Sequence, residues 1–165
     1  MIKAGIVGYG NLGRGVRLAV EKAPDMECVG IFTRRAPETV KPVIDTPVYS
    51  FSDMEKFIVK IDVMLLCGGS ATDLPNITKT VLKNFNTVDS FDTHAKIPEY
   101  FESLDKTAKE SGNLALISVG WDPGLFSIAR MLFGAILPDG NDYTFWGKGV
   151  SQGHSDAIRR IDGVK

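Results

Sequence analysis

The chain has 165 residues, of which 44% are hydrophobic and 24% charged, and its formal net charge is -1. This composition is typical of a folded globular protein and excludes disordered and collagen-like chains. The small net charge argues against a general nucleic-acid binder, and no apolar run approaches the roughly 20 residues of a membrane span. The first residues enter a strand pattern at once, so we expect no signal peptide and a cytoplasmic location. Cys28 and Cys67 lack disulfide or metal-ligand spacing, so we expect two small buried side chains and no metal site.

Short apolar segments alternate with helical patterns through residue 119. Strands are expected at 2–7, 27–33, 48–51, 62–67, 87–90 and 114–119. Helices are expected at 12–23, from a cap at Ser52 or Asp53 to 60, at 73–83 and at 97–111, with a loop at 34–47. Continuous apolar strands separated by helices predict a parallel sheet covered on both faces. The expected fold class is therefore α/β, with a doubly wound, Rossmann-like sheet over residues 1–120.

The pattern changes after residue 120. A strongly apolar helix is expected at 125–137, a short strand at 143–146, and a polar stretch continues to the end of the chain. These features predict that residues 121–165 begin a second α+β domain.

A glycine motif follows the first predicted strand. The residues Gly8-Tyr9-Gly10-Asn11-Leu12-Gly13 match the pattern G-x-G-x-x-G, and a helix is expected to start within them. In a dinucleotide site the first glycine permits a tight turn, the second lets the backbone approach a pyrophosphate, and the third lets helix and strand pack closely. The alternative is a glycine-rich turn without a ligand. The strand before the motif and the helix after it favour a dinucleotide.

The end of the second strand indicates which dinucleotide binds. NAD-binding proteins place an acidic residue there to accept the ribose 2′-hydroxyl, whereas this chain has Thr33-Arg34-Arg35. A hydroxyl and two guanidinium groups suit a 2′-phosphate, and each charge-assisted contact contributes roughly 1.5–3 kcal/mol. The alternative is a solvated arginine pair at the start of a loop. With the glycine motif present, we predict NADP.

Polar residues also follow the later strands, where ligands bind in open parallel sheets. Asp92 and Asp122 are each expected at the end of a buried strand and are the candidate catalytic groups. Their alternatives are a helix or turn cap for Asp92 and an Asp-Pro turn for Asp122. Cys67 to Ser70 could line the cofactor, or could form a plain turn with Ser70 or Thr72 as helix cap. Trp121 is expected in the core or in a pocket wall.

Longer motifs occur in several parts of the chain. They cover residues 5–14, 31–35, 66–73, 88–94, 119–127 and 144–156. The last two read Val119-Gly-Trp-Asp-Pro-Gly-Leu-Phe-Ser127 and Thr144-Phe-Trp-Gly-Lys-Gly-Val-Ser-Gln-Gly-His-Ser-Asp156. Together these stretches resemble the family of meso-diaminopimelate D-dehydrogenases, and the resemblance extends over essentially the whole chain.

The resemblance implies NADP-dependent oxidative deamination of the small molecule meso-2,6-diaminopimelate at its D-centre. The NADP contacts that it implies are Tyr9, Gly10, Asn11, Leu12, Thr33, Arg34, Arg35, Cys67, Gly68, Gly69, Ser70, Ser90, Phe91, Asp92, Val119, Gly120, Trp121, Asp122 and Pro123. The substrate contacts that it implies are Asp92, Asp122, Trp146, Gln152 and Gly153. The resemblance also implies a homodimeric two-domain enzyme about twice this length, so the chain is expected to be an N-terminal portion.

Two other functions are compatible with the motifs. One is a different two-domain NADP oxidoreductase, such as a sugar or semialdehyde dehydrogenase, against which the Gly-Trp-Asp-Pro-Gly stretch argues. The other is a non-catalytic module that senses NADP and regulates a partner, which the short chain favours and the change of pattern after Gly120 disfavours.

Overall fold

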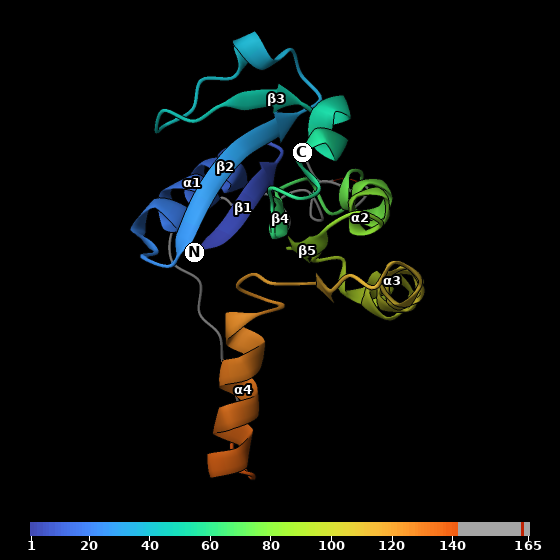
Figure 1. The fold of residues 1–165 in the computed structure, drawn as a ribbon. Coiled ribbons are helices and arrows are strands. Elements are labelled where there is room, and N and C mark those ends of the chain that lie inside the picture. Colours follow the sequence, from blue (N-terminus) through green and yellow to red (C-terminus); the bar gives the residue numbers. More distant parts are fainter. Residues whose placement is uncertain (142–162, 164–165) are drawn as a thin grey trace. The chain divides into compact units, whose positions relative to one another are not determined.

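A six-stranded parallel sheet organises the fold, which is taken from a computed structural model that describes residues 1–141 and 163 (Figure 1). The strands are β1 Ile2–Val7, β2 Met26–Thr33, β3 Val48–Ser50, β4 Val63–Leu66, β5 Asn86–Asp89 and β6 Ala115–Leu116. Their order is β3-β2-β1-β4-β5-β6. This is the strand order of the doubly wound dinucleotide-binding fold, in which the order reverses between β1 and β4. The predicted fold class is confirmed.

Helices connect the strands. The α-helices are α1 Asn11–Lys22, α2 Leu74–Leu82, α3 Ile97–Ser111 and α4 Leu125–Ile136. The described residues also form three short 3₁₀ helices, η1 Pro37–Thr39, η2 Phe51–Phe57 and η3 His94–Lys96. None of the helices in the described part of the chain is long and apolar enough to cross a bilayer.

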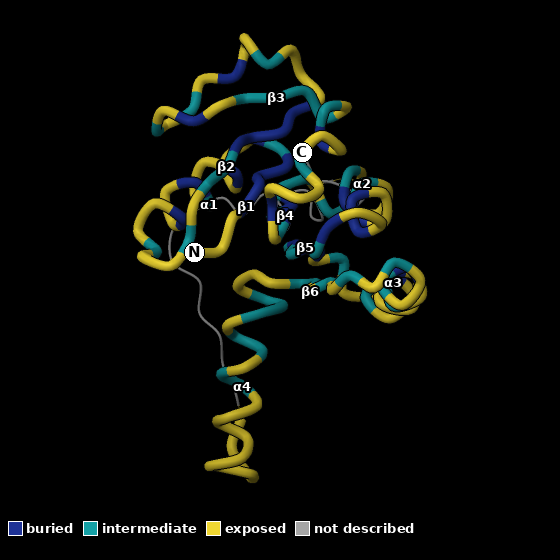
Figure 2. Tube along the Cα trace, viewed as in Figure 1, coloured by how far each residue is buried: buried dark blue, intermediate teal, exposed yellow. Residues whose placement is uncertain are grey.

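Both faces of the sheet are covered, as the apolar strands predicted. Successive residues of a strand point to opposite faces, so Ile6 and Val7 of β1 belong to two different core clusters. Ile6 packs in the cluster that Val16 of α1 joins, and Val7 packs in the cluster built from α2 and α3. Figure 2 shows the resulting buried stretches along β1 and β2.

Two predicted elements differ from the structure. The helix expected from Ser52 or Asp53 is the 3₁₀ helix η2, and its cap is Ser50, whose hydroxyl accepts a hydrogen bond from the Ser52 amide at 3.4 Å. The strand expected at 114–119 keeps only two residues. Ser118 has φ 59°, in the left-handed region, so extended pairing cannot continue through it.

The chain divides into two compact units, Met1–Ala129 and Arg130–Lys165. Every residue of the site described below belongs to the first unit. The expected strand at 143–146 lies outside the described residues, and so do the predicted substrate contacts Trp146, Gln152 and Gly153.

Candidate functional site

A pocket of about 500 Å³ opens at the carboxyl ends of β1, β2 and β4. Its lining comes from these strand ends, from the start of α2 and from η2. The lining residues are Val7, Gly8, Tyr9, Gly10, Phe32, Thr33, Arg34, Arg35, Phe51, Leu66, Cys67, Gly68, Asp73, Leu74 and Ile77. Because the strand order reverses between β1 and β4, the pocket occupies the position at which doubly wound sheets bind nucleotides.

The glycine motif forms the turn between β1 and α1. Gly8 has φ +87°, a conformation that residues with a Cβ rarely adopt, and its amide donates to the Phe32 carbonyl at 2.9 Å. A Cβ on Gly13 would lie 2.3 Å from the Gly8 carbonyl oxygen, whereas a Cβ on Gly10 would have no atom within 4 Å. Gly13 therefore allows the close packing of helix on strand. At Gly10 the space beside the backbone is open, so a phosphate could approach the main chain there.

The start of α1 suits an anion. Gly10 precedes the helix, no side chain caps it, and its first turn contains no acidic residue. The first amides of a helix lack partners within the helix, and the helix dipole adds about half a positive charge there. A glycine cradle beside such a helix start fits the pyrophosphate of a dinucleotide.

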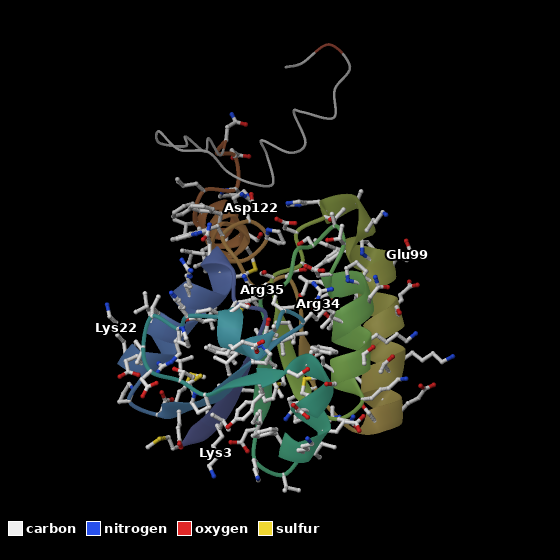
Figure 3. The ribbon with its side chains drawn as sticks, turned by 90° about the horizontal axis from the view of Figure 1, so that it is seen from above. Lys3, Lys22, Arg34, Arg35, Glu99 and Asp122 are labelled. Atoms are coloured by element: carbon white, nitrogen blue, oxygen red, sulfur yellow. The ribbon has the colours of Figure 1, made fainter. Side chains whose placement is uncertain are left out.

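The two arginines after β2 line the same pocket (Figure 3). The Arg35 guanidinium donates to the Tyr9 carbonyl at 2.9 Å, and the Arg35 amide donates to the Thr33 hydroxyl at 3.1 Å. Arg34 pairs with Asp73 across the pocket, with 2.5 Å between Nη2 and Oδ1. Thr33, Arg34 and Arg35 thus line the same pocket as the glycine turn, and their binding of a 2′-phosphate stays a prediction.

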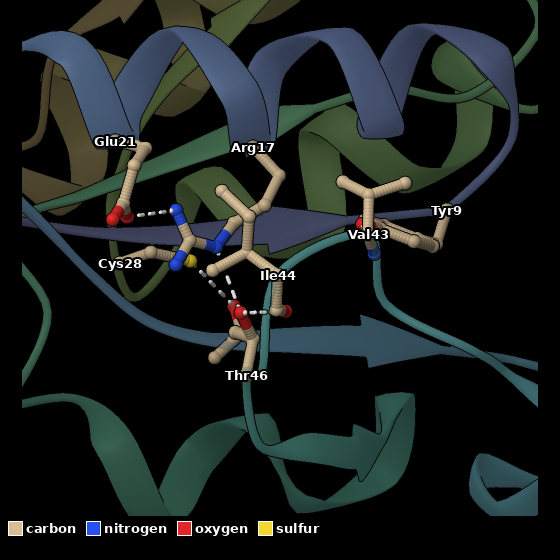
Figure 4. Close-up of polar contacts among 8 residues, drawn as sticks. Tyr9, Arg17, Glu21, Cys28, Val43, Ile44 and Thr46 are labelled. Carbon is tan, nitrogen blue, oxygen red and sulfur yellow. Dashed lines mark hydrogen bonds and ion pairs between the residues drawn. The ribbon is translucent and has the colours of Figure 1, made fainter.

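The loop that follows the arginines is attached to α1 and to the glycine turn (Figure 4). Buried Arg17 donates from Nε to the Thr46 hydroxyl at 2.7 Å and pairs with Glu21 at 2.8 Å. The Val43 amide donates to the Tyr9 hydroxyl at 3.0 Å. These contacts attach residues 43–46, at the end of the loop that follows Arg34 and Arg35, to α1 and to the glycine turn, and no pattern in the sequence predicted them.

Asp73 is a pocket residue that was not predicted from the sequence. Its Oδ2 accepts a hydrogen bond from the Gly69 amide at 3.1 Å, and its Oδ1 pairs with Arg34. The Gly69 amide and then Arg34 hold the pKa of this carboxyl below its ordinary value. Neither Ser70 nor Thr72 caps α2, which begins directly after Asp73. In the sequence, Asp73 stands at the start of the helix predicted at 73–83. That helix start lies at the same carboxyl end of the sheet as Arg34, and this position could have indicated a pocket residue.

The segment after β4 forms another part of the pocket wall. Cys67 and Gly68 line the pocket, whereas Gly69 and Ser70 do not. Both cysteines are partly exposed rather than fully buried, which corrects the expectation for them. Burial still raises the pKa of the Cys67 thiol to about 12, so Cys67 is a neutral wall residue at pH 7. The Ser70 hydroxyl accepts from the Asp92 amide at 2.9 Å and lies 3.4 Å from the Ser90 carbonyl oxygen.

The two candidate catalytic aspartates lie outside this pocket. Asp92 is exposed and follows β5 by three residues, and Asp122 is partly buried, with its Oδ1 3.3 Å from the Ser127 hydroxyl (Figure 3). The expectation that both end buried strands is wrong for Asp122, because β6 is short and its Leu116 is exposed. Trp121 is 66% exposed and stacks on Phe126, so it is neither a core residue nor part of the pocket wall.

Other predicted cofactor contacts do not line the pocket. Asn11, Leu12 and Gly13 form the first turn of α1. Phe91 is buried, its ring stacks on Tyr100 with centroids 4.1 Å apart, and its amide donates to the Asp89 carboxylate, so neither its ring nor its amide is open to a ligand. The remaining predicted contacts outside the lining are Ser90, Val119, Gly120 and Pro123.

Comparison with known proteins identifies what this arrangement resembles. Residues 120–165 match the family model of the diaminopimelic acid dehydrogenase C-terminal domain. A meso-diaminopimelate D-dehydrogenase from Lysinibacillus sphaericus is 62% identical over 164 residues, which are 99% of this chain and 50% of that protein. The chain is similar to meso-diaminopimelate D-dehydrogenases over nearly its whole length. The resemblance inferred from the motifs is confirmed, and the chain spans about half the length of the curated relatives that it matches.

Solved structures agree with the sequence relatives. A mutant meso-diaminopimelate dehydrogenase from Clostridium tetani E88 with DAP has a TM-score of 0.87 and 53% identity, over all of this chain and 51% of that one. An engineered D-amino acid dehydrogenase bound to NADP+ has a TM-score of 0.85 and 47% identity, over 98% of this chain and 50% of that one. The similarity to meso-diaminopimelate D-dehydrogenases is therefore one of structure as well as sequence.

Proposed function

We propose that the protein carrying this chain is an NADP-dependent enzyme that oxidatively deaminates meso-2,6-diaminopimelate at its D-centre. Substrate, NADP+ and one water would give L-2-amino-6-oxopimelate, ammonium, NADPH and a proton. The observation that carries the proposal is the pocket in which the glycine turn and the two arginines meet, in a chain 62% identical to a meso-diaminopimelate D-dehydrogenase. A solved relative bound to NADP+ supports the same cofactor.

The cofactor contacts follow from the geometry of the pocket. Gly8, Gly10 and the start of α1 would hold the pyrophosphate, because open backbone and free helix amides are available there. Arg34 and Arg35, with the Thr33 hydroxyl, would hold the 2′-phosphate. The nicotinamide, when bound, accepts the hydride from the D-centre of the substrate. The other proposed cofactor contacts are Tyr9, Asn11, Leu12, Gly13, Cys67, Gly68, Gly69, Ser70, Ser90, Phe91, Asp92, Val119, Gly120, Trp121, Asp122 and Pro123.

The substrate contacts are proposed on the family resemblance. The carboxyl groups of Asp92 and Asp122 would attract and orient the ammonium group at the D-centre. Trp146, Gln152 and Gly153 are proposed to complete this part of the site. Correct placement of the amine matters because a shift on the order of 1 Å can cost about a hundredfold in rate.

The proposal includes a wider organisation. Residues 1–120 would form the dinucleotide-binding domain and residues 121–165 the beginning of a substrate and dimerisation domain, in a cytoplasmic homodimer. The match of residues 120–165 to a C-terminal domain model supports this boundary.

The test is NADPH formation by the full-length protein, followed by absorbance at saturating NADP+. The proposal predicts turnover of meso-diaminopimelate and none of the LL isomer, which lacks a D-centre. Turnover of a sugar or a semialdehyde instead would favour a different NADP oxidoreductase. Tight NADPH binding without turnover of any of these compounds would favour a sensor.

A further inference from the structure

One buried carboxylate connects two segments at the carboxyl ends of the strands. Asp89, the last residue of β5, is 3% exposed. Its Oδ1 accepts hydrogen bonds from the Phe91 amide at 3.0 Å and from the Ser118 amide at 3.2 Å. Its carbonyl oxygen accepts from the Val119 amide at 2.8 Å. A single residue therefore fixes the backbone that leads to Asp92 and the backbone that leads to the turn containing Asp122.

The other carboxylate oxygen of Asp89 is held by the helices. The Tyr100 hydroxyl of α3 donates to Oδ2 at 2.5 Å, and the Thr78 hydroxyl of α2 lies 3.3 Å from the same oxygen. Burial and the neighbouring carboxylate raise the pKa of the Tyr100 phenol, so it stays protonated and remains a donor. Both oxygens of the buried carboxylate thus have partners, and the helices orient the side chain.

The Ser118 backbone depends on this contact. Its φ of 59° is unfavourable for a residue with a Cβ, and its side-chain hydroxyl has no hydrogen-bond partner among the described residues. The Asp89 carboxylate is the acceptor that the structure provides for its amide. Without that acceptor, the Ser118 amide would lose its partner, while the contact between the Val119 amide and the Asp89 carbonyl oxygen would remain.

We propose that Asp89 is a positioning residue of the site: its carboxylate sets the places of Asp92 and of the Gly120–Asp122 turn relative to each other. The proposal rests on the proposed function, in which both aspartates bind the substrate ammonium. Asp89 is buried, and it would act through the amides of Phe91 and Ser118 rather than by direct contact with a ligand. The acceptor at Oδ1 is the essential part, and the negative charge is not.

Two substitutions that keep the number of heavy side-chain atoms separate the role of the acceptor from that of the charge. In Asp89→Asn the amide oxygen can still accept from both backbone amides, while the new NH2 group donates to the Tyr100 and Thr78 oxygens. In Asp89→Leu no acceptor remains. Tyr100→Phe is the matched control, because it removes a hydroxyl on the helix side and leaves the Oδ1 contacts in place.

The experiment measures steady-state kinetics with meso-diaminopimelate and NADP+, and amide hydrogen exchange, in the full-length protein. We expect Asp89→Leu to lower kcat/KM at least tenfold with a raised KM for the amino acid, and to speed exchange at Phe91 and Ser118 at least tenfold. Asp89→Asn and Tyr100→Phe should stay within threefold of the unchanged protein in both measurements. Activity that is lost in Asp89→Leu and kept in Asp89→Asn would show that the site needs the acceptor at Oδ1 and not the charge.

Other results overturn the proposal. A folded Asp89→Leu protein with kcat/KM within threefold of the unchanged protein does so, and so does a Tyr100→Phe protein that loses as much as Asp89→Leu. If Asp89→Leu does not fold, Asp89→Ser replaces it under the same limits, because its hydroxyl is too short to reach both amides. An unchanged protein without turnover refutes the proposed function instead, and amide exchange then decides whether Asp89 holds the two segments.

Discussion

Replacing Gly13 by alanine tests the packing that shapes the nucleotide turn. The added Cβ would lie 2.3 Å from the Gly8 carbonyl oxygen, and real Cβ contacts below 3.0 Å essentially never occur. The helix or the turn must therefore move by at least the difference, about 0.7 Å. Overpacking of this kind costs typically about 1–3 kcal/mol, and alanine returns up to about 1 kcal/mol through its higher helix propensity. We expect a net loss of about 1–2 kcal/mol in the free energy of unfolding.

Gly15 provides a matched control in the same helix. A Cβ there has no atom within 4 Å, so Gly15→Ala should stabilise the protein by up to about 1 kcal/mol. Urea unfolding measures both changes. Because the displaced turn contains Gly8 and Gly10, NADPH affinity should also fall at least tenfold in Gly13→Ala and stay unchanged in Gly15→Ala. Equal stability and equal NADPH affinity of the two variants would refute the reasoning.

Three further predictions concern side chains in the pocket. Arg35→Ala should weaken NADPH binding about tenfold or more and leave NADH binding unchanged in a calorimetric titration, whereas equal losses for both would contradict its role at the 2′-phosphate. The folded structure lowers the pKa of Asp73, so the stability that its ionised carboxylate contributes is complete above the ordinary pKa of 3.8 and is lost as the pH falls further. The difference in unfolding free energy between the unchanged protein and Asp73→Asn should therefore shrink between pH 7 and pH 3. An equal difference at both pH values would argue against this role of Asp73. Cys67, with a thiol pKa of about 12, should react with a disulfide reagent at pH 8 at least tenfold more slowly than in urea-unfolded protein, and equal rates would show that burial does not protect it.

The predicted elements that match the structure carry strong local signals. Helix α3 begins and ends at the predicted residues, because Pro98 lies in its first turn and Gly112 ends it in a left-handed conformation. The strands at Ile2–Val7 and Val63–Leu66 are apolar runs bounded by turn residues, and both lie in the sheet where expected. The glycine motif could be interpreted because its strand and helix were both recognisable.

The features that could not be predicted depend on contacts between distant residues. Arg34 meets Asp73, and Asp89 meets Ser118, only after the crossovers bring their strand ends to one edge of the sheet. The shortness of β6 follows from the left-handed Ser118, which no local pattern indicates because serine rarely adopts that conformation. The exposure of Trp121 contradicts the expectation of a core or pocket-wall residue, which followed from the high average burial of tryptophan.

The most direct measurement of the central claim is a pair of calorimetric titrations of the full-length protein with NADPH and with NADH. The glycine turn should hold the pyrophosphate of both, and the Thr33-Arg34-Arg35 segment should make NADPH bind at least about tenfold more tightly. Equal affinities for the two nucleotides, or no binding of either by a folded protein, would contradict it.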